Sequence, residues 1–296
     1  MIIKHFRFFY FLFCFSILIF SCQPKKSTIG NTQQNKSEEI NFKYLTKNKN
    51  YVSAHRGGSG IDDYPENCIE TFNHLYNNGI KIFEIDIAET KDKKLILMHD
   101  NSLQRTSTGK QDVNQLNLDN IKNYYLVDDF GNTTPFKIPT FDEALKWGKE
   151  KSIYFMVDIK KGVDYNDIVS LVNKNKMQNQ VVLVTYTVGQ AKKLHQIAPD
   201  ILLSVSMRNE HEFDEMMNSG IPTDKMVAFT GTKRNNKSFL DKIHDKNILV
   251  IFGTLGNLDK SNSAKNGQLY RDLEKDGVDI FATDRAIFVH QTINKN

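Results

Sequence analysis

Cysteine is scarce in this chain, and the scarcity limits what can hold the fold together. Only three occur among 296 residues: Cys14, Cys22 and Cys68. Cys14 lies within an apolar N-terminal run and Cys22 follows that run, which leaves Cys68 with nothing to pair with. A disulfide framework is therefore excluded, and the folded part must depend on a buried apolar core.

A hydrophobic run long enough to cross a membrane is also missing. The apolar run over residues 8–20 is broken only by Ser16, and it falls short of the roughly 20 residues that span a bilayer. Lys4 and Arg7 precede it, and Ser21-Cys22 ends it. This pattern resembles the lipobox of bacterial lipoproteins, in which the leader is removed and the cysteine is acylated. We expect a signal peptide over 1–21 and a lipid on Cys22, with a transmembrane anchor as the alternative.

A strong charge of one sign is absent from the folded part. Residues 1–50 carry eight Lys and Arg against two Asp and Glu, which leaves 31 basic and 33 acidic residues in the remainder. This balance gives no support for a nucleic-acid partner. Residues 22–46 are rich in Gln, Lys, Ser, Thr and Asn, too polar to bury a core, and are expected to form a flexible tether. The chain is therefore predicted to be an exported, membrane-anchored lipoprotein on the periplasmic or cell-surface side.

The folded part, residues 47–296, alternates β-branched runs with amphipathic stretches. The predicted strands are Tyr51–Arg56, Lys81–Ala88, Ile153–Lys160, Val181–Tyr186, Leu202–Met207, Met226–Gly231, Ile248–Gly253 and Asp279–Thr283. The predicted helices are Glu66–Asn77, Phe141–Glu150, Tyr165–Asn173, Val188–Ile197, Glu210–Ser219, Lys237–Asp245 and Ser263–Lys275. This alternation favours parallel pairing. A (β/α)8 barrel is predicted, and the alternative, an open doubly wound sheet, lacks a glycine-rich phosphate fingerprint.

One strand-like run, Leu95–Asp100, is left over from this count. It follows the second predicted strand after only a few polar residues, too few for a parallel crossover. We expect it to fold back as a hairpin arm above the barrel. That arm would return His99 to the level of Glu84 and Asp86.

Three carboxylates are expected at the C-terminal ends of the barrel strands, where function gathers in this fold. Glu84 and Asp86 are two apart in one strand and therefore share a face, and Asp158 ends the next barrel strand. The negative charges of these three carboxylates repel one another unless a hard divalent cation, Ca²⁺ or Mg²⁺, binds to their oxygens. The alternative for Asp158 is a salt bridge to Lys160.

Two histidines accompany these carboxylates at predicted strand ends, His55 and His99. Two histidines that converge on a metal cluster favour acid–base work over a structural role. Arg56 and Lys160 add positive charge that suits an anionic substrate, above all a phosphate.

Six motifs in this order resemble the glycerophosphodiester phosphodiesterase family. They are AHRGG (54–58), PEN (65–67), EIDIAETKDKKLILMHD (84–100), LQRTSTG (103–109), IPTFDEAL (138–145) and DIK (158–160), with GVDIFATD (277–284) as a looser match. The resemblance implies a barrel with one divalent metal on Glu84, Asp86 and Asp158, and His55 and His99 as the catalytic pair. It also implies that Arg56 faces the phosphate and that Glu66 gives polar support, although Glu66 could equally be the N-terminal charge of the following helix.

The chain departs from the family pattern at three places. Asp158 stands where the family usually has Glu, and Cys68 stands where Thr usually follows PEN. A Trp-Thr pair of the family's substrate cleft is replaced within IFGTLGN (251–257), where Phe252 is expected to take the aromatic role.

The function expected from these features is hydrolysis of glycerophosphodiesters to sn-glycerol 3-phosphate and an alcohol. The expected route passes through a cyclic phosphate, with His55 as base and His99 as acid. A phosphodiesterase acting on another lipid-derived diester is a close variant. A surface lipoprotein that binds diesters without turnover is the alternative from a different class. We expect a monomer whose partners are the small-molecule substrate and, through the lipid, the membrane.

Overall fold

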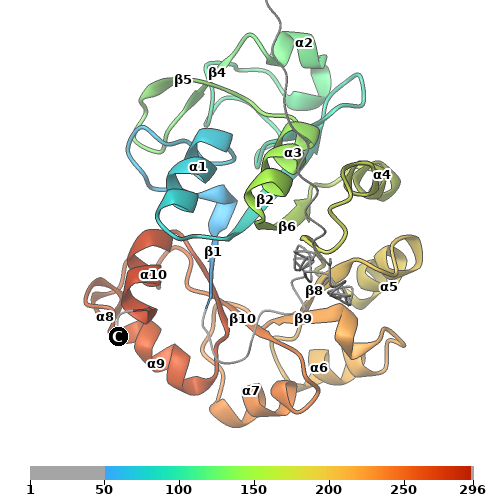
Figure 1. Ribbon diagram of the computed structural model, residues 1–296, viewed down its shortest axis with the longest axis vertical. Coiled ribbons are helices and arrows are strands. Elements are labelled where there is room, and N and C mark those ends of the chain that lie inside the picture. Colours follow the sequence, from blue (N-terminus) through green and yellow to red (C-terminus); the bar gives the residue numbers. More distant parts are fainter. Residues whose placement is uncertain (1–50, 295–296) are drawn as a thin grey trace, which may run out of the picture. The chain divides into compact units, whose positions relative to one another are not determined.

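The computed structural model describes residues 51–294, apart from the side chain of Asn262, and its centre is a closed ring of parallel strands (Figure 1). In order around the ring these are β1 (Tyr51–Ala54), β2 (Ile82–Glu89), β6 (Tyr154–Ile159), β7 (Val181–Val184), β8 (Leu202–Ser206), β9 (Met226–Phe229), β10 (Val250–Gly253) and β11 (Ile280–Thr283). Strand β1 pairs in parallel with β11 on one side and with β2 on the other, which closes the ring. The predicted (β/α)8 barrel is confirmed.

Helices join the strands and cover the outside of the ring. They are α1 (Ile69–Asn77), α3 (Phe141–Lys151), α4 (Tyr165–Asn175), α5 (Val188–Ile197), α6 (Glu210–Met217), α7 (Lys237–His244), α8 (Asn262–Lys265), α9 (Gln268–Asp276) and α10 (Ala286–Ile293). The helix predicted over 263–275 is divided in two, because Gly267 adopts a φ of 78° and caps the second piece. Helix α10 lies in a segment for which the sequence pattern predicted no helix.

Apolar side chains form one layer inside the ring and another between the ring and the helices. The inner layer includes Ile82, Met156, Val182, Val227 and Ile251. Neighbouring residues on the same strands point outward and pack against helices, as Phe83 and Phe155 do. This alternation follows from the two-residue period of a strand.

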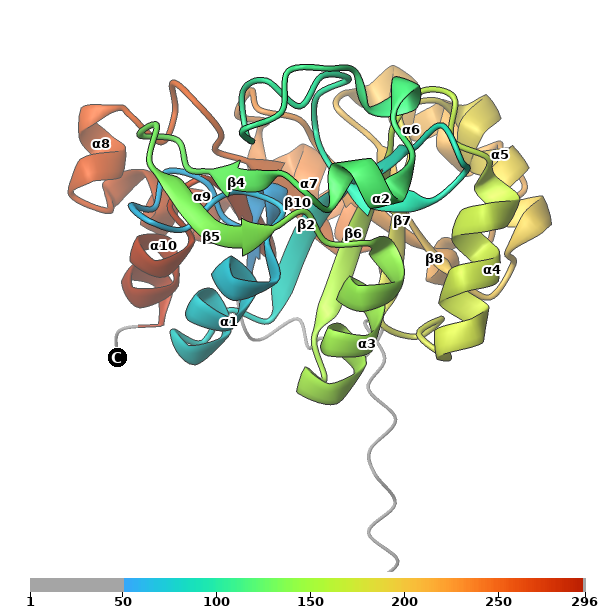
Figure 2. The same ribbon diagram turned by 90° about the horizontal axis from the view of Figure 1, so that it is seen from above.

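A segment inserted between β2 and α3 has an apolar cluster of its own. Strand β3 (Leu95–Leu97) pairs antiparallel with β2, which confirms the predicted hairpin. The insertion continues through α2 (Leu118–Ile121) and a second antiparallel pair, β4 (Tyr125–Val127) and β5 (Thr133–Lys137), which the sequence did not predict. Figure 2 shows α2, β4 and β5 gathered on one side of the barrel. Beneath them pack Ile96, Met98, Leu103, Ile121 and Leu126.

Because the ring strands are parallel, their C-terminal ends meet at one end of the barrel, which we call the mouth. The chain enters the barrel at Tyr51, at the opposite end. The predicted signal peptide, the lipid on Cys22 and the tether over 22–46 lie outside the described residues and stay predictions. Between residues 51 and 294, no helix is both long and apolar enough to cross a membrane.

Candidate active site

The loop after β1 is shaped by its two glycines and carries the first two polar side chains of the mouth. His55, Arg56 and Gly57 form a single 3-10 turn in which Arg56 adopts a φ of 52°. A Cβ on Gly57 would lie 2.0 Å from Cε1 of Phe72, so this position has no room for a side chain. The Arg56 backbone N–H donates to Oε2 of Glu84 at 2.8 Å. The loop is therefore fixed to the second strand at the first of the three carboxylates.

Glu84, Asp86 and Asp158 meet at the mouth as the sequence analysis expected. One oxygen of each lies within 4.8 Å of the other two, and Asp86 stands directly opposite Asp158 in the pairing of β2 with β6. Burial and the negative charge of Asp86 raise the pKa of Glu84 well above its usual range. Three convergent carboxylates cannot all ionise easily at the same time, because their negative charges repel one another. They provide the oxygen donors that a hard divalent cation prefers. The residues present thus fit a metal ion.

Lys160 lies against this cluster, so the salt bridge weighed as the alternative for Asp158 is also present. Its Nζ is 2.6 Å from Oδ1 of Asp86 and 2.6 Å from Oδ2 of Asp158. Burial alone would lower the pKa of Lys160, but the two carboxylates raise it overall. The ammonium therefore faces the carboxylates and offsets part of their charge. Its predicted role in binding substrate stays a prediction.

Another acidic group, formed by Asp62, Asp63 and Asp128, differs from this cluster in its partners. Asp62 and Asp63 are exposed. The carboxylate of Asp128 accepts hydrogen bonds from the backbone N–H groups of Asp63, Phe130 and Asn132. These hydrogen bonds hold the pKa of Asp128 below its usual value although burial opposes this, whereas the pKa of Glu84 is raised.

Asn67, the last residue of the PEN motif, positions Asp86. Its side-chain Nδ2 donates to Oδ2 of Asp86 at 2.8 Å, and its Oδ1 accepts from the Asp86 backbone N–H at 3.0 Å. The residue is 2% exposed and adopts a φ of 53°, which Asn tolerates better than most residues. The sequence analysis noted the motif but gave Asn67 no role.

His99 is held on both sides of its ring. Nδ1 lies 2.7 Å from Oδ1 of Asp100, and Nη2 of Arg56 lies 3.0 Å from Nε2. A guanidinium can only donate, so Nε2 accepts here and the ring proton is on Nδ1, directed at Asp100. Arg105 donates to both oxygens of Asp100, and these hydrogen bonds help to hold the pKa of that carboxyl far below its usual range.

Glu66 orients the arginine that faces His99. It is 3% exposed and accepts from Nη1 of Arg56 at 3.1 Å and from two nitrogens of Arg105 at 2.8 Å each. Burial would raise the pKa of Glu66, but the two guanidinium groups hold it below its usual value. Helix α1 begins three residues later, at Ile69, so the two arginines account for this carboxylate better than a helix N-terminus does. Arg105, within the LQRTSTG motif, received no role from sequence.

His55 is paired with a carboxylate from the far end of the sequence. Its Nδ1 is 2.7 Å from Oδ1 of Asp284, which follows β11. Asp284 also accepts from the hydroxyl of Ser59 and from the backbone N–H of Gly256. Burial opposes ionisation of Asp284, yet these hydrogen bonds and the neighbouring histidine lower its pKa to about 2. The residue ends the GVDIFATD stretch, but its pairing with His55 needed the closed ring.

Both histidines and all three carboxylates line one cavity of about 180 Å³, whose floor includes Met156 and Ile251. Phe252 does not line it, contrary to the sequence analysis. It is 2% exposed and belongs to the layer between ring and helices, because strand alternation turns Ile251 inward and Phe252 outward. The aromatic residues at the cavity are instead Tyr186, just beyond β7, and Phe229 of β9.

Comparisons with known proteins identify the family to which the chain belongs. The model of the glycerophosphoryl diester phosphodiesterase family matches residues 55–286. A glycerophosphodiester phosphodiesterase of Bacillus subtilis (strain 168) is 29% identical over 202 residues, 62% of this chain and 68% of the relative. The crystal structure of a glycerophosphoryl diester phosphodiesterase from Parabacteroides distasonis ATCC 8503 aligns with a TM-score of 0.79 at 28% identity, over 86% of this chain and 89% of that one.

A phosphodiesterase of Oleispira antarctica, solved in complex with the product sn-glycerol-3-phosphate, shares the fold. Its TM-score is 0.63 at 16% identity, over 85% of this chain and 99% of that one. The family model spans the chain from His55 to the start of α10, and so includes every residue of the site described above. The family predicted from the motifs is thus confirmed. The chain belongs to the glycerophosphoryl diester phosphodiesterase family and is a phosphodiesterase.

Proposed function

We propose that the chain hydrolyses glycerophosphodiesters to sn-glycerol 3-phosphate and an alcohol with the help of a divalent cation. One observation carries the proposal: two histidines, each bound through Nδ1 to a carboxylate, line the same cavity as three convergent carboxylates. A site that only bound diesters would have no need for two oriented imidazoles.

Glu84, Asp86 and Asp158 are proposed to hold the cation, Ca²⁺ or Mg²⁺. When bound, it supplies positive charge that offsets the negative charge of the phosphodiester. Arg56 adds a second positive charge beside His99, and Glu66 keeps its guanidinium in place. Among the described residues, Nε of Arg56 is a buried donor with no acceptor, which leaves this guanidinium with unused capacity for an anion.

In the first step the 2-hydroxyl of the glycerol attacks phosphorus and the bond to the leaving alcohol breaks, which gives a cyclic phosphate. His55 takes the hydroxyl proton at Nε2, since Nδ1 is bound to Asp284. His99 gives a proton to the departing oxygen. The substrate phosphate competes for Arg56, which frees Nε2 of His99 to carry that proton, and Asp100 stabilises the resulting imidazolium.

In the second step water opens the cyclic phosphate, and the two histidines exchange roles. His99 takes a proton from water as the new bond to phosphorus forms. His55 returns a proton to the 2-oxygen as its bond to phosphorus breaks. The products are glycerol phosphate and the alcohol, and both rings regain their first protonation state.

Turnover of glycerophosphocholine, glycerophosphoethanolamine and glycerophosphoinositol with Ca²⁺, Mg²⁺ or chelator tests the proposal, with an intact phospholipid alongside. We expect metal-dependent release that His55→Ala and His99→Ala each reduce by at least about a hundredfold. A native chain that binds a diester but cleaves none under any of these conditions would make it a binding protein.

A p-nitrophenyl ester of glycerol phosphate separates the two histidine roles, because its leaving group departs without a proton. If His99 is the acid, His99→Ala keeps most of the native rate of p-nitrophenol release in the first turnover of this ester, whereas its cleavage of glycerophosphocholine is lost. His55→Ala loses activity on both. If His55→Ala instead keeps its activity on the p-nitrophenyl ester and His99→Ala does not, His99 is the base and His55 is the acid.

We also propose that the chain is an exported lipoprotein, based on the lipobox-like sequence that ends at Cys22. Labelling of cells with a radioactive fatty acid tests this proposal. The native chain should take up label and sediment with membranes, and Cys22→Ala should do neither. Equal labelling of Cys68→Ala and the native chain serves as the control.

A further inference from the structure

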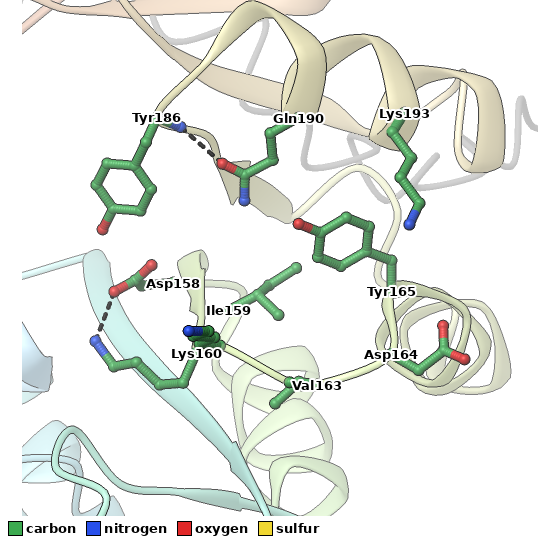
Figure 3. A pocket seen from close by; sticks show the side chains of 11 residues that line it. Asp158, Ile159, Lys160, Val163, Asp164, Tyr165, Tyr186, Gln190 and Lys193 are labelled. Carbon is green, nitrogen blue, oxygen red and sulfur yellow. Dashed lines mark hydrogen bonds and ion pairs between the residues drawn. The ribbon is translucent and has the colours of Figure 1, made fainter.

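A groove of about 800 Å³ opens beside the carboxylate cluster and is not used by the steps above. It lies over the loops that follow β6 and β7, and Figure 3 shows the side chains around it. Asp158 and Tyr186 line both this groove and the catalytic cavity, so the two spaces meet at these residues. A diester whose phosphate sits at the carboxylates can therefore extend one arm straight into the groove.

The arm that enters the groove follows from the proposed roles of the histidines. On the opposite side of the cavity, His55 and Ser59 line a smaller hollow of about 370 Å³. His55, as the base, must reach the glycerol hydroxyl, which places the glycerol arm on that side. The leaving alcohol then points toward the groove, where there is room for a group larger than glycerol.

The charges in the groove favour a negative group over a positive one. Lys161 and Lys193 are exposed and line it, and Lys161 has no hydrogen bond or ion pair to any residue between 51 and 294. Lys160 is already neutralised by its two carboxylates. The carboxylate of Asp164, also in the groove, caps α4 by accepting from the Asn166 backbone N–H. The exposed ammonium groups of Lys161 and Lys193 thus line the groove, while its two carboxylates, Asp164 and Asp158, are committed to a helix cap and to Lys160.

Two tyrosines in the groove would suggest a site for a quaternary ammonium, but one aromatic face is taken. Nζ of Lys193 lies 5.1 Å from the centre of the Tyr165 ring, the position that a choline group would need. The other tyrosine, Tyr186, points its hydroxyl toward Asp158 (Figure 3). A choline arm that reached the Tyr165 ring would therefore meet an ammonium group.

Gln190 adds a neutral donor to this surface. Its Oε1 accepts from the Tyr186 backbone N–H at 2.9 Å, which turns the amide nitrogen toward the groove (Figure 3). A side-chain NH₂ beside two ammonium groups can donate to hydroxyl or phosphate oxygens.

We propose that this groove binds the leaving alcohol and selects a polyol that carries a further negative charge, such as a phosphate monoester. The inference rests on the proposed function, since it assigns one arm of the same diester. Lys161 and Lys193 are the residues that set the preference, and Gln190 contributes a hydrogen bond to the polyol.

The experiment compares kcat/KM for three esters that differ in the charge of the leaving alcohol: glycerophosphoinositol 4-phosphate, glycerophosphoinositol and glycerophosphocholine. We expect the native chain to prefer the first over the last by about tenfold or more at low salt, and less at high salt. Lys161→Gln with Lys193→Gln should lower the value for the phosphorylated ester about tenfold and raise it for the choline ester. Lys161→Glu with Lys193→Glu should reverse the order of preference.

Lys192→Gln is the matched control, because Lys192 is exposed on the same helix as Lys193 but does not line the groove. It should leave the preference unchanged. If the paired Gln variant keeps the native preference, or the native chain prefers choline, the groove assignment is wrong while hydrolysis itself still supports the proposed function. If the native chain cleaves none of the esters with any metal, the proposed function fails and this inference fails with it.

Discussion

At the scale of single residues, each histidine of the site is hydrogen-bonded through Nδ1 to a carboxylate. This leaves Nε2 as the nitrogen that can exchange a proton with the substrate. Asp284 fixes His55, and Asp100 fixes His99. Such a carboxylate sets the tautomer and the angle of the ring, and it stabilises the imidazolium once a proton arrives. Asp284 does this as a positioning residue, since the atoms that react lie beyond the ring.

Asp284→Asn is expected to lower kcat by about a hundredfold with little change in KM, because an amide can hold the ring in the wrong tautomer. Steady-state kinetics on glycerophosphocholine measure both constants. Ser59→Ala removes only one of the other hydrogen bonds to Asp284 and should cost far less. A native kcat in Asp284→Asn would contradict the positioning role.

Asp284 also links stability to pH. Its pKa is lowered from 3.8 to about 2, so the folded state favours the charged form. This preference adds about 2 kcal/mol to the free energy of unfolding above pH 4, and the contribution disappears as the pH falls through 2. Urea unfolding at several pH values should show Asp284→Asn less stable than the native chain at pH 6, with the gap closing toward pH 2. A gap that stays constant would mean that the carboxylate charge is not its source.

At the scale of elements, the N-terminus of α1 lacks the cap that a hydroxyl would give. Cys68 is the N-cap residue, its side chain makes no capping hydrogen bond, and burial raises the pKa of its thiol to about 12. The thiol donates to Glu70 instead. The helix that supports the HRGG loop therefore begins with a thiol at the N-cap in place of the hydroxyl or carboxylate that caps best.

Cys68→Ser should raise the free energy of unfolding by about 1 kcal/mol, because a serine hydroxyl at the N-cap accepts from the first turn of the helix. Thermal unfolding of Cys68→Ser beside Cys68→Ala measures the effect. The two variants remove the same sulfur and differ only in the hydroxyl. Equal melting temperatures would show that this helix start gains nothing from a cap.

Element by element, the sequence predicted the ring well and the insertion poorly. Ring strands are buried runs of β-branched residues, and their periodicity is strong. Strands β4 and β5 are short and only partly buried, and they are joined by a turn through Gly131 at φ 90°, so their pattern is weak. Helix α10 was missed because its residues are apolar on most faces, which gives little helical periodicity.

The residues of the site likewise fall into those that the sequence predicted and those that it did not. Side chains on the ring strands, such as Glu84 and Asp158, could be placed from the strand pattern alone. Asn67, Arg105 and Asp284 could not, because they act through other side chains. The contact between His55 and Asp284 joins residues 229 positions apart and exists only because β1 pairs with β11.

At the scale of the whole molecule, the closed ring brings several negative charges together at the mouth, and the protein's own positive charges there do not balance them. Three carboxylates share the mouth with one ammonium group. Burial and Asp86 raise the pKa of Glu84, so the metal-free fold favours its protonated form. In the unfolded chain Glu84 ionises near 4.5, and stability without metal therefore falls as the pH rises above that value.

Glu84→Gln should accordingly raise the melting temperature in chelator at pH 8 and abolish the rise that Ca²⁺ or Mg²⁺ gives to the native chain. The native gain from metal should grow between pH 5 and pH 8, as the proton on Glu84 becomes easier to displace. Glu150→Gln, at an exposed position of α3, is the control and should keep the native metal response. A metal response that survives in Glu84→Gln would place the ion elsewhere.

The direction of the strands also decides which end of the enzyme can be tied down. The polypeptide enters the barrel at Tyr51, at the end away from the mouth. A bead or a sensor surface attached next to Tyr51 would therefore sit at the end of the barrel away from the mouth and leave the groove open to solution.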